Sequence, residues 1–418
     1  MKRIYETLLR EYLDMFPCVA LIGPRQSGKT TLLHTLPNDW NYFDLESSSD
    51  YSVIADDPDL FLRLNSDKVA IDEAQILPAL FTALRVAIDA DRTTKGRFII
   101  TGSSSPSLLR SISESLAGRI GIIEISPFMW AEVNERTVST LVNSIVDGPK
   151  DPQSVIDALA PGARSLEDAF GIRDIRDVFD YWFRGGYPEP WLENNRRFSE
   201  RWADQYVTTY LQRDVARLFP GLNQERFRIF LQMLGGSSGQ VINYANIARA
   251  IGVSQPTARD YFEIAHGTFI WRRIPAYSKN TTKRIVKHPK GYMRDSGLLH
   301  FLLRIQDIPS LQAHPQAGAS WEGMVIEEII RQLNSLGVSF DYYYYRTAAG
   351  AEVDLILDGA FGTIPVEIKS GQNVGLRDLK SIRNFIKEQE CPYGVVINND
   401  TKPRLYDDKL LGIPFAFL

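Results

Sequence analysis

The sequence predicts an α/β protein in which two blocks of alternating strands and helices flank a mostly helical middle. In the first block, up to about residue 130, short apolar segments alternate with helical patterns. The alternation returns from about residue 320, whereas residues 166–235 are helical in pattern. Such alternation is typical of a mostly parallel sheet with helices on both faces. The strands expected in the first block are Cys18–Ile22, Asn41–Leu45, Lys68–Ile71, Arg97–Thr101 and Gly121–Ile125.

The composition is that of a soluble globular protein, with 44% hydrophobic and 23% charged residues. The net charge of −4 argues against a protein that coats nucleic acid along its whole surface, but it allows a local basic patch. Cys18 and Cys391 are the only cysteines, which fits a reducing compartment. The first residues lack the apolar run of a signal peptide, and no apolar stretch reaches the length of a membrane-spanning helix. We therefore expect a cytoplasmic protein without membrane association.

A phosphate-binding loop is predicted directly after the first strand. Residues 23–30, Gly-Pro-Arg-Gln-Ser-Gly-Lys-Thr, match the pattern G-x-x-x-x-G-K-[ST], and a helical pattern follows. The glycines let successive backbone N–H groups point at phosphates, and the helix N-terminus adds positive potential. Lys29 is expected to reach the β- and γ-phosphates and Thr30 to bind Mg²⁺. The predicted ATP-binding residues are Gly23, Pro24, Arg25, Gln26, Ser27, Gly28, Lys29, Thr30 and Thr31.

Two carboxylates end the strand at Lys68–Ile71. Asp72 suits the Mg²⁺ shell, and Glu73 suits a base that orients the attacking water. A kinase acting on a small molecule has no use for such a base, because its substrate is the nucleophile. The pair therefore favours ATP hydrolysis. The strand at Arg97–Thr101 ends in small polar residues, of which Thr101 or Ser103 is expected to sense the γ-phosphate or position water.

These motifs resemble AAA+ ATPases, and more closely a prokaryotic family that joins an AAA-type ATPase to a C-terminal domain of unknown function. The resemblance rests on residues 23–30, Ile-Asp-Glu-Ala-Gln at 71–75, Thr-Gly-Ser-Ser at 101–104 and Leu-Ala-Gly-Arg at 116–119. Arg-Gly-Gly-Tyr-Pro-Glu-Pro at 184–190 and Tyr-Leu-Gln-Arg-Asp-Val at 210–215 extend it along the chain. It implies that Arg119, or less directly Arg213, contacts the γ-phosphate in its own or a neighbouring subunit. By fold-level analogy it also implies a homo-oligomer.

The middle of the chain predicts a winged helix. A helix over 243–251 ends at Gly252, Ser254 is a plausible N-cap of a second helix through about Ala265, and Phe269–Ile274 has the pattern of a strand. Residues 272–294 then contain eight Lys or Arg and no Asp or Glu. We expect salt-sensitive contacts with DNA phosphates there. A solvated hairpin, or a winged helix that binds only protein, is the alternative. The proposed DNA contacts are Lys279, Lys283, Arg284, Lys287 and Lys290.

Three residues that could hold a metal ion or activate water lie on two predicted strands near the C-terminus. Asp354 lies on 351–357, and Glu367 and Lys369 lie on 363–369. Glu367 and Lys369 are two apart and share a face. Two carboxylates could hold Mg²⁺ and the lysine could activate water. The set resembles the PD-(D/E)xK nucleases, specifically the Holliday-junction-resolvase-like branch. The resemblance places Glu322, with Glu327 as a substitute, at the acidic position of the preceding helix.

Four regions follow from these patterns: a P-loop α/β domain over 1–145, a helical lid-like domain over 146–235, a winged-helix-like domain over 236–310 and a restriction-endonuclease-like α/β domain over 311–418. The first functional hypothesis is an AAA+ ATPase that uses ATP and Mg²⁺ to process DNA, including branched DNA. The second is an ATPase switch without nuclease activity, whose last domain only binds a partner or DNA.

Overall fold

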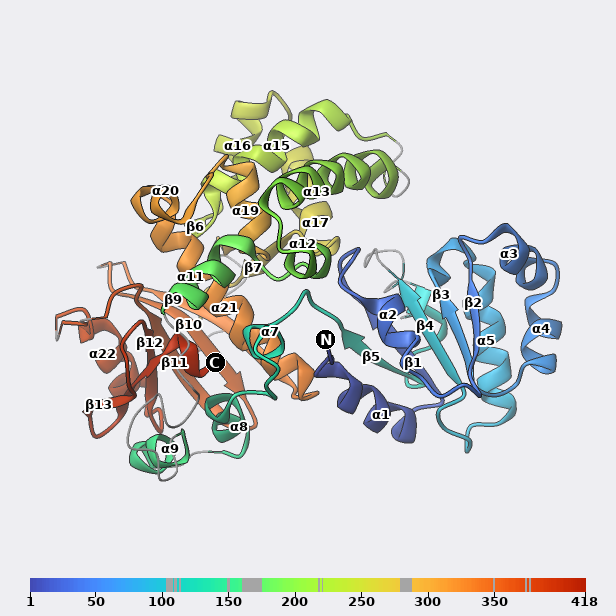
Figure 1. Ribbon diagram of the computed structural model, residues 1–418, viewed down its shortest axis with the longest axis horizontal. Helices are drawn as coiled ribbons and strands as arrows, with labels where there is room; N and C mark the ends of the chain where they lie inside the picture. Colours follow the sequence, from blue (N-terminus) through green and yellow to red (C-terminus); the bar gives the residue numbers. More distant parts are fainter. Residues whose placement is uncertain are drawn as a thin grey trace.

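The computed structural model describes residues 1–102, 108, 111–112, 114–148, 151–159, 175–216, 219, 221–278, 288–348, 350–372, 374–375 and 377–418, without the side chains of residues 213 and 214. The chain forms three bodies: an N-terminal sheet with its helices, a helical body, and a second sheet that holds the C-terminus (Figure 1). Within the described residues, no helix is both long and apolar enough to cross a lipid bilayer.

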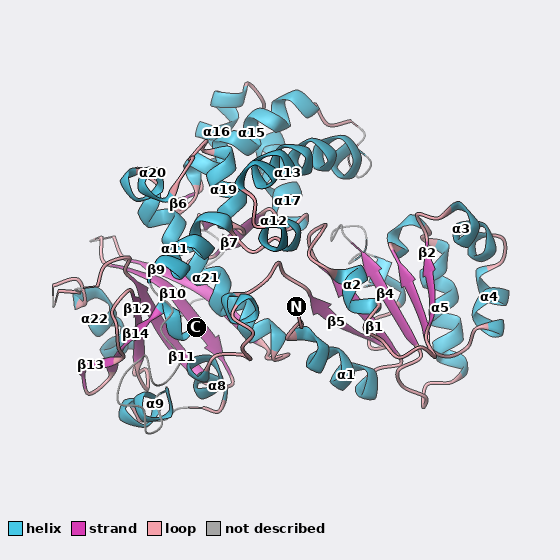
Figure 2. Cartoon of the chain, in the orientation of Figure 1, coloured by secondary structure: helices cyan, strands magenta, loops and turns pink. Residues whose placement is uncertain are grey.

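The N-terminal body is built on five parallel strands in the order β2-β3-β4-β1-β5 (Figure 2). The strands are β1 (Cys18–Ile22), β2 (Asn41–Asp44), β3 (Val69–Asp72), β4 (Phe98–Gly102) and β5 (Ile120–Glu124). The helices are α1 (Tyr5–Met15), α2 (Lys29–Leu33), α3 (Ser48–Ala55), α4 (Pro58–Leu64) and α5 (Ala79–Ala90), with the 3₁₀ turn η1 (Ala74–Ile76). The predicted parallel sheet is confirmed. Because parallel strands share their carboxyl edge, the residues after β1, β3 and β4 gather at one place.

Strand β1 explains why helices cover both faces of this sheet. All five of its residues are buried. Cys18, Ala20 and Ile22 belong to one hydrophobic cluster and Val19 and Leu21 to another. Successive side chains of a strand point to opposite faces, so a continuous apolar run needs cover on both.

The helical body contains a small antiparallel sheet in the order β6-β8-β7. The N-cap expected at Ser254 is confirmed, since its hydroxyl accepts the N–H of Thr257 at 3.2 Å, and Gly252 closes the preceding helix with φ of 68°. The elements are α11 (Ile175–Arg184), α12 (Pro188–Glu193), α13 (Arg196–Thr209), the π-helix η2 (Tyr210–Val215), α15 (Gln224–Ser237), β6 (Gln240–Val241), α16 (Tyr244–Ile251), α17 (Gln255–Gly267), β7 (Trp271–Ile274), β8 (Lys290–Met293), α19 (Ser296–Leu302) and α20 (Ile308–Ala313).

The C-terminal body is a six-stranded mixed sheet in the order β13-β14-β12-β11-β10-β9. The long helix α21 precedes it and is buried along most of its length, because it lies between this sheet and the other two bodies (Figure 1). The elements are α21 (Ala317–Ser335), β9 (Phe340–Arg346), β10 (Glu352–Gly359), β11 (Gly362–Ile368), α22 (Lys380–Gln389), β12 (Gly394–Asn398), β13 (Arg404–Asp407), β14 (Leu410–Pro414) and the 3₁₀ turn η3 (Phe415–Phe417).

Three helices after β5 pack on the C-terminal body and not on the N-terminal sheet. They are α7 (Trp130–Val133), α8 (Thr140–Val146) and α9 (Pro152–Leu159). Trp130 lies in the same hydrophobic cluster as Trp321 and Phe415, and its backbone N–H donates to Glu328 at 3.0 Å. This differs from the boundary expected at residue 145. Apolar periodicity shows that a helix face is buried, but it does not show which sheet covers it.

Candidate active site

The loop after β1 has a backbone that requires its two glycines. Gly23 has φ of 153°, and a Cβ there would collide with the carbonyl oxygen of Ile125. Gly28 has φ of 91° and begins α2, with the Nη1 atom of Arg3 3.0 Å from where a Cβ would lie. Both positions are in the left-handed region that favours glycine. The loop therefore follows the edge of β5 closely and leads into the N-terminus of α2.

The ammonium of Lys29 lies inside this loop. The residue is 5% exposed, and its Nζ donates to the carbonyl oxygens of Gly23 at 3.0 Å and Pro24 at 2.8 Å. The Lys29 ammonium therefore lies where it could form ion pairs with phosphates bound by the loop. Of the other predicted loop residues, Arg25 is half-buried, 4.0 Å from Glu46, and Thr31 is exposed.

Asp72 receives hydrogen bonds from three other elements at the carboxyl edge of the sheet. The hydroxyl of Thr30 donates to its Oδ2 at 2.6 Å, and that of Tyr42 donates to the same oxygen at 3.0 Å. The hydroxyl of Thr101 donates to Oδ1. Asp72 is buried, so these contacts fix its orientation. Carboxylate and hydroxyl oxygens are ligands that Mg²⁺ prefers, so this donor set fits Mg²⁺.

Glu73 follows directly after Asp72 and has a strained backbone. Its φ is 55°, which is uncommon for a residue with a side chain. Its N–H donates to Asp72 Oδ1 at 3.1 Å and to Thr101 Oγ1 at 3.3 Å. The side-chain amide of Gln75 donates to the Glu73 carboxylate. Gln75, which closes the motif at 71–75 but had no predicted role, therefore orients Glu73.

The structure places the other four predicted residues differently. Ser103 lies outside the described residues, whereas Thr101 has its hydroxyl bound to Asp72. Arg119 precedes β5, and the register of Cys18 opposite Ile120 puts it at the amino edge of the sheet. There it forms an ion pair with Asp89 at 2.8 Å. Because the phosphate loop follows the opposite edge, Arg119 does not reach the phosphates of its own subunit, which corrects that alternative. The side chain of Arg213 is not described.

The sequence motifs missed Arg3, which fixes the phosphate loop from the N-terminal arm. Its Nη1 donates to the carbonyl oxygen of Ser27 at 2.5 Å and its Nη2 to that of Ser126 at 2.7 Å. Its Nε pairs with Glu132 at 2.9 Å, and the side chain is 7% exposed. A buried arginine that binds two backbone segments holds them in a fixed relation. No motif spacing pointed to it, because its partners are far along the chain.

We expect Arg3→Met to raise the KM for ATP about tenfold with a smaller change in kcat. The substitution removes a charge-assisted hydrogen bond to the loop, a contact worth about 1.5–3 kcal/mol, while Glu73 is untouched. Steady-state ATPase assays over a range of ATP concentrations measure it. Arg10→Met is the matched control, since Arg10 lies on α1 with its side chain 73% exposed. An unchanged KM in Arg3→Met would show that Ser27 is positioned without Arg3.

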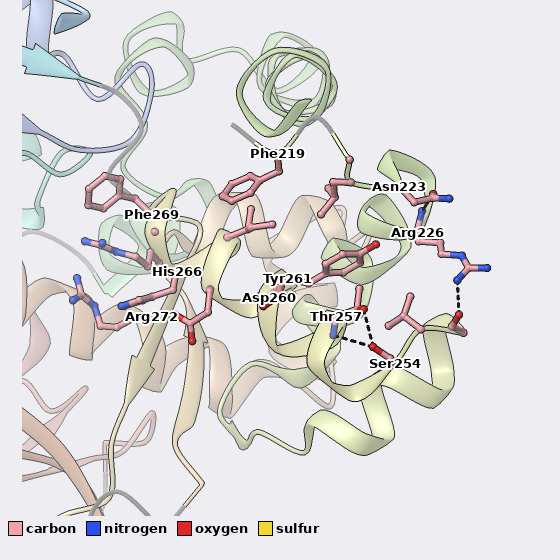
Figure 3. A pocket seen from close by; sticks show the side chains of 18 of the residues that line it. Phe219, Asn223, Arg226, Ser254, Thr257, Asp260, Tyr261, His266, Phe269 and Arg272 are labelled. Carbon is pink, nitrogen blue, oxygen red and sulfur yellow. Dashed lines mark hydrogen bonds between the residues drawn. The ribbon is translucent and has the colours of Figure 1, made fainter. Parts of the chain in front are cut away.

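A cleft of about 1230 Å³ lies beside the carboxyl edge of the N-terminal sheet, facing α17 (Figure 3). Ile22 and Glu124 line it from β1 and β5, and Arg272, Arg294 and Phe269 line it from the helical body. The ring of Phe269 belongs to the hydrophobic cluster of the N-terminal body although its backbone belongs to the helical body. The cleft is therefore formed by both bodies together.

Three residues that line this cleft, Glu124, Arg272 and Arg294, belong to a buried ionic cluster that joins all three bodies. Arg294 pairs with Glu124 of β5, and Arg272 pairs with Glu327 of α21. Arg331 lies 3.5 Å from the same Glu327 carboxylate. Burial opposes the charge of Glu327, but attraction by Arg272 and Arg294 outweighs it and lowers the pKa of the carboxyl to about 2. The carboxylate thus stays charged in the interior.

The basic stretch is only partly described. Lys279, Lys283, Arg284 and Lys287 lie outside the described residues. The fifth predicted DNA contact, Lys290, is 5% exposed, and its ammonium pairs with Glu322 at 3.1 Å and with Glu352. This corrects its assignment as a surface phosphate contact. A lysine that follows a run of basic residues can equally be the first residue of a strand and point inward.

The predicted acidic residues of the C-terminal body lie close together. β10 and β11 are antiparallel with Leu355 opposite Val366, so the adjacent Asp354 and Glu367 face each other. Burial raises the pKa of both carboxyls, and for Asp354 repulsion from Glu322 and Glu367 adds to it. Lys369 donates to Glu367 at 2.6 Å. Among the described residues, however, no three His, Cys, Asp or Glu side chains converge as metal ligands.

Comparison with known proteins identifies families for most of the chain. Residues 15–134 match a family model described as an AAA domain, and residues 175–308 and 317–417 each match a domain of unknown function. Uncharacterized proteins of Mycobacterium tuberculosis and Mycobacterium bovis are each 35% identical to this chain over 363 residues, which is 86% of this chain and 72% of theirs.

Solved structures with detectable similarity include a Walker-type ATPase of Pyrococcus abyssi. It is 15% identical with a TM-score of 0.38, over 72% of this chain and 94% of that one. A RuvB variant of Thermotoga maritima is 19% identical with a TM-score of 0.25, over 65% of this chain and 89% of that one.

Proposed function

This chain belongs to the same family as the two mycobacterial proteins, with an AAA domain as its N-terminal body, and we propose that it is a Mg²⁺-dependent ATPase whose turnover is coupled to DNA. The observation that supports hydrolysis is the arrangement of Thr30, Asp72 and Glu73 at one edge of the sheet. The Asp72 carboxylate accepts hydrogen bonds from three hydroxyls, whereas the Glu73 carboxylate accepts one from the side-chain amide of Gln75. The two carboxylates can therefore serve different purposes.

In this proposal each residue performs one task. The N–H groups of the loop and the Lys29 ammonium bind the β- and γ-phosphates, and Thr30 and Asp72 hold Mg²⁺, which neutralises phosphate charge when bound. Glu73 accepts a proton from the water that attacks the γ-phosphorus, and the bond to the ADP oxygen breaks. Gln75 keeps the Glu73 carboxylate oriented. The Thr101 hydroxyl accepts the backbone N–H of Glu73 and donates to Asp72, so it links the two residues.

The helical body supplies the argument for DNA. The order α15, β6, α16, α17, β7, β8, with β8 between β6 and β7, supports a winged helix. Asp260 and Glu263 of α17 line the cleft, so that face of the helix is unsuited to phosphates. The sequence between β7 and β8, in contrast, has four Lys or Arg and no Asp or Glu, so its charge suits phosphates. We therefore propose that this hairpin, and not α17, binds the DNA backbone.

We expect DNA to stimulate ATP turnover and Lys283→Glu/Arg284→Glu to weaken DNA binding at least tenfold. Two lost phosphate contacts should also reduce the slope of log K against log salt by about 2. Fluorescence anisotropy at several salt concentrations measures both quantities, using duplexes and four-way junctions. Lys380→Glu/Lys387→Glu on the exposed face of α22 is the matched control. Equal affinity and slope in the two double variants would remove the hairpin as a DNA site.

The C-terminal body supports two roles. Its helix–three strands–helix–strand order, with Asp354, Glu367 and Lys369 together, favours a PD-(D/E)xK-like nuclease domain that acts on branched DNA. The alternative is an ATPase switch whose last domain only binds a partner or DNA. The ion pairs that Lys290 makes with Glu322 and Glu352 favour that second role in the described state. Mn²⁺-dependent cleavage of a junction, lost in Asp354→Asn, separates the two.

A further inference from the structure

The Lys290 ammonium lies in a different body from its backbone. Lys290 begins β8 of the helical body, yet its Nζ pairs with Glu322 of α21 and Glu352 of β10 in the C-terminal body. Tyr292, on the same face of β8, donates its hydroxyl to Glu322. The Lys290 side chain is 6% exposed. Strand β8 is thus bound to Glu322, which the nuclease-like interpretation assigns to a metal, and to Glu352.

Within the described part of the chain, this site has four carboxylates and three cations paired with them. The four carboxylates are Glu322, Glu352, Asp354 and Glu367, and the cations paired with them are Lys290, Lys369 and Arg346. The Oε2 atom of Glu367 is buried and has no hydrogen-bond partner among the residues that the structure describes. Asp354 faces it across the sheet. A buried, unpaired carboxylate oxygen beside a second carboxylate is the kind of position that a hard divalent cation satisfies.

We propose that Lys290 is a built-in counterion of this acidic site, and that it and a divalent cation bind there in competition. Both need Glu322, and both neutralise the same charge, so the site accepts the cation with high affinity only when β8 withdraws the ammonium. This inference rests on the proposed cation-dependent role of the C-terminal body.

The contacts of β8 with β7 and α21 would allow a movement of the hairpin to control this competition. β8 pairs with β7, where Arg272 is opposite Tyr292. Arg272 pairs with Glu327, five positions after Glu322 on α21. The β7–β8 hairpin is therefore attached to one helix at two points. A force that moves the hairpin off α21, such as DNA bound to it, removes the counterion and opens the cation site.

The test is the Mn²⁺ affinity of the full-length, EDTA-treated protein, measured by isothermal titration calorimetry without nucleotide. We expect Lys290→Met to bind Mn²⁺ about 10–100-fold more tightly than the wild type, since one nearby charge changes a site's affinity for a cation by that order. Lys290→Arg keeps the charge and should resemble the wild type. So should Lys380→Met, an exposed lysine on α22. Mn²⁺ should also raise the melting temperature most in Lys290→Met.

The outcomes distinguish this inference from the proposal beneath it. If wild type and Lys290→Met bind Mn²⁺ equally, the competition is wrong and the cation site stands. If neither binds, the cation site and the nuclease-like role both fail, whereas ATP hydrolysis is unaffected. The gained affinity must also disappear in Lys290→Met/Asp354→Asn; if it persists, Mn²⁺ binds elsewhere and the inference is overturned. Should Lys290→Met not fold, Lys290→Gln keeps a hydrogen-bond donor without the charge and gives the same comparison.

Discussion

Glu73→Gln is expected to lower kcat for ATP hydrolysis by about 10²–10⁴-fold, the usual contribution of a positioned general base, while ATP still binds. Glutamine has nearly the same shape and can keep the contact with Gln75, but it cannot accept the proton of the attacking water. Phosphate release measures the rate, and equilibrium binding of a fluorescent ATP analogue measures the affinity. A variant that binds ATP without turning it over would identify Glu73 as the base.

Glu135→Gln is the matched control for this experiment. Glu135 is exposed and has the same unusual φ of 55°, so it reproduces the substitution and the backbone strain without the site. It should hydrolyse ATP at the wild-type rate. If Glu73→Gln retained more than about a tenth of the wild-type kcat, another group would have to activate the water, and the assignment of Glu73 would be wrong.

Glu327→Gln is expected to lower the free energy of unfolding by about 3–5 kcal/mol, the range seen when one partner of a buried ion pair is removed. Glu327 is 2% exposed and faces Arg272, Arg294 and Arg331, and without it these guanidinium groups lose their common anion. Urea denaturation followed by circular dichroism measures the change. The control is Glu200→Gln, whose ion pair with Arg196 is on the surface and should change stability by less than about 0.5 kcal/mol. A loss below about 1 kcal/mol in Glu327→Gln would mean that the cluster does not hold the three bodies together.

The stability lost in Glu327→Gln is expected to depend on pH. The pKa of Glu327 is about 2 in the folded chain against an ordinary value of 4.5. A lowered carboxyl pKa contributes stability above the unfolded pKa, and that stability is lost as the pH falls through the folded pKa. The difference in stability between wild type and Glu327→Gln should therefore be full at pH 6 and shrink between about pH 4.5 and 2. A difference independent of pH would point to lost packing.

The sequence predicted the nucleotide site better than it predicted how the bodies meet. Residues 23–30 and 72–73 follow strands whose parallel pairing forces them to one edge, so a local pattern was sufficient. Arg3 and the cluster around Glu327 were missed, because their partners are distant in the sequence and carry no spacing rule. Gln75 stands in the motif at 71–75, two residues from Glu73, but the motif gave it no role. Lys290 was assigned to the surface because charge alone does not show whether a lysine has a buried carboxylate to pair with.

The packing of α7–α9 on the C-terminal body affects how the chain is made. Trp130 donates its indole N–H to the carbonyl oxygen of Ala416, 286 residues later. During synthesis, the N-terminal sheet can fold as soon as β5 emerges, because all its strands are then present. Trp130 of α7 also contacts Tyr181 of α11, and α8 packs on α21, so the apolar faces of these helices are covered completely only when the whole C-terminal body has been made. Until then, part of these faces is an exposed surface of the kind that chaperones bind and that aggregates when unprotected.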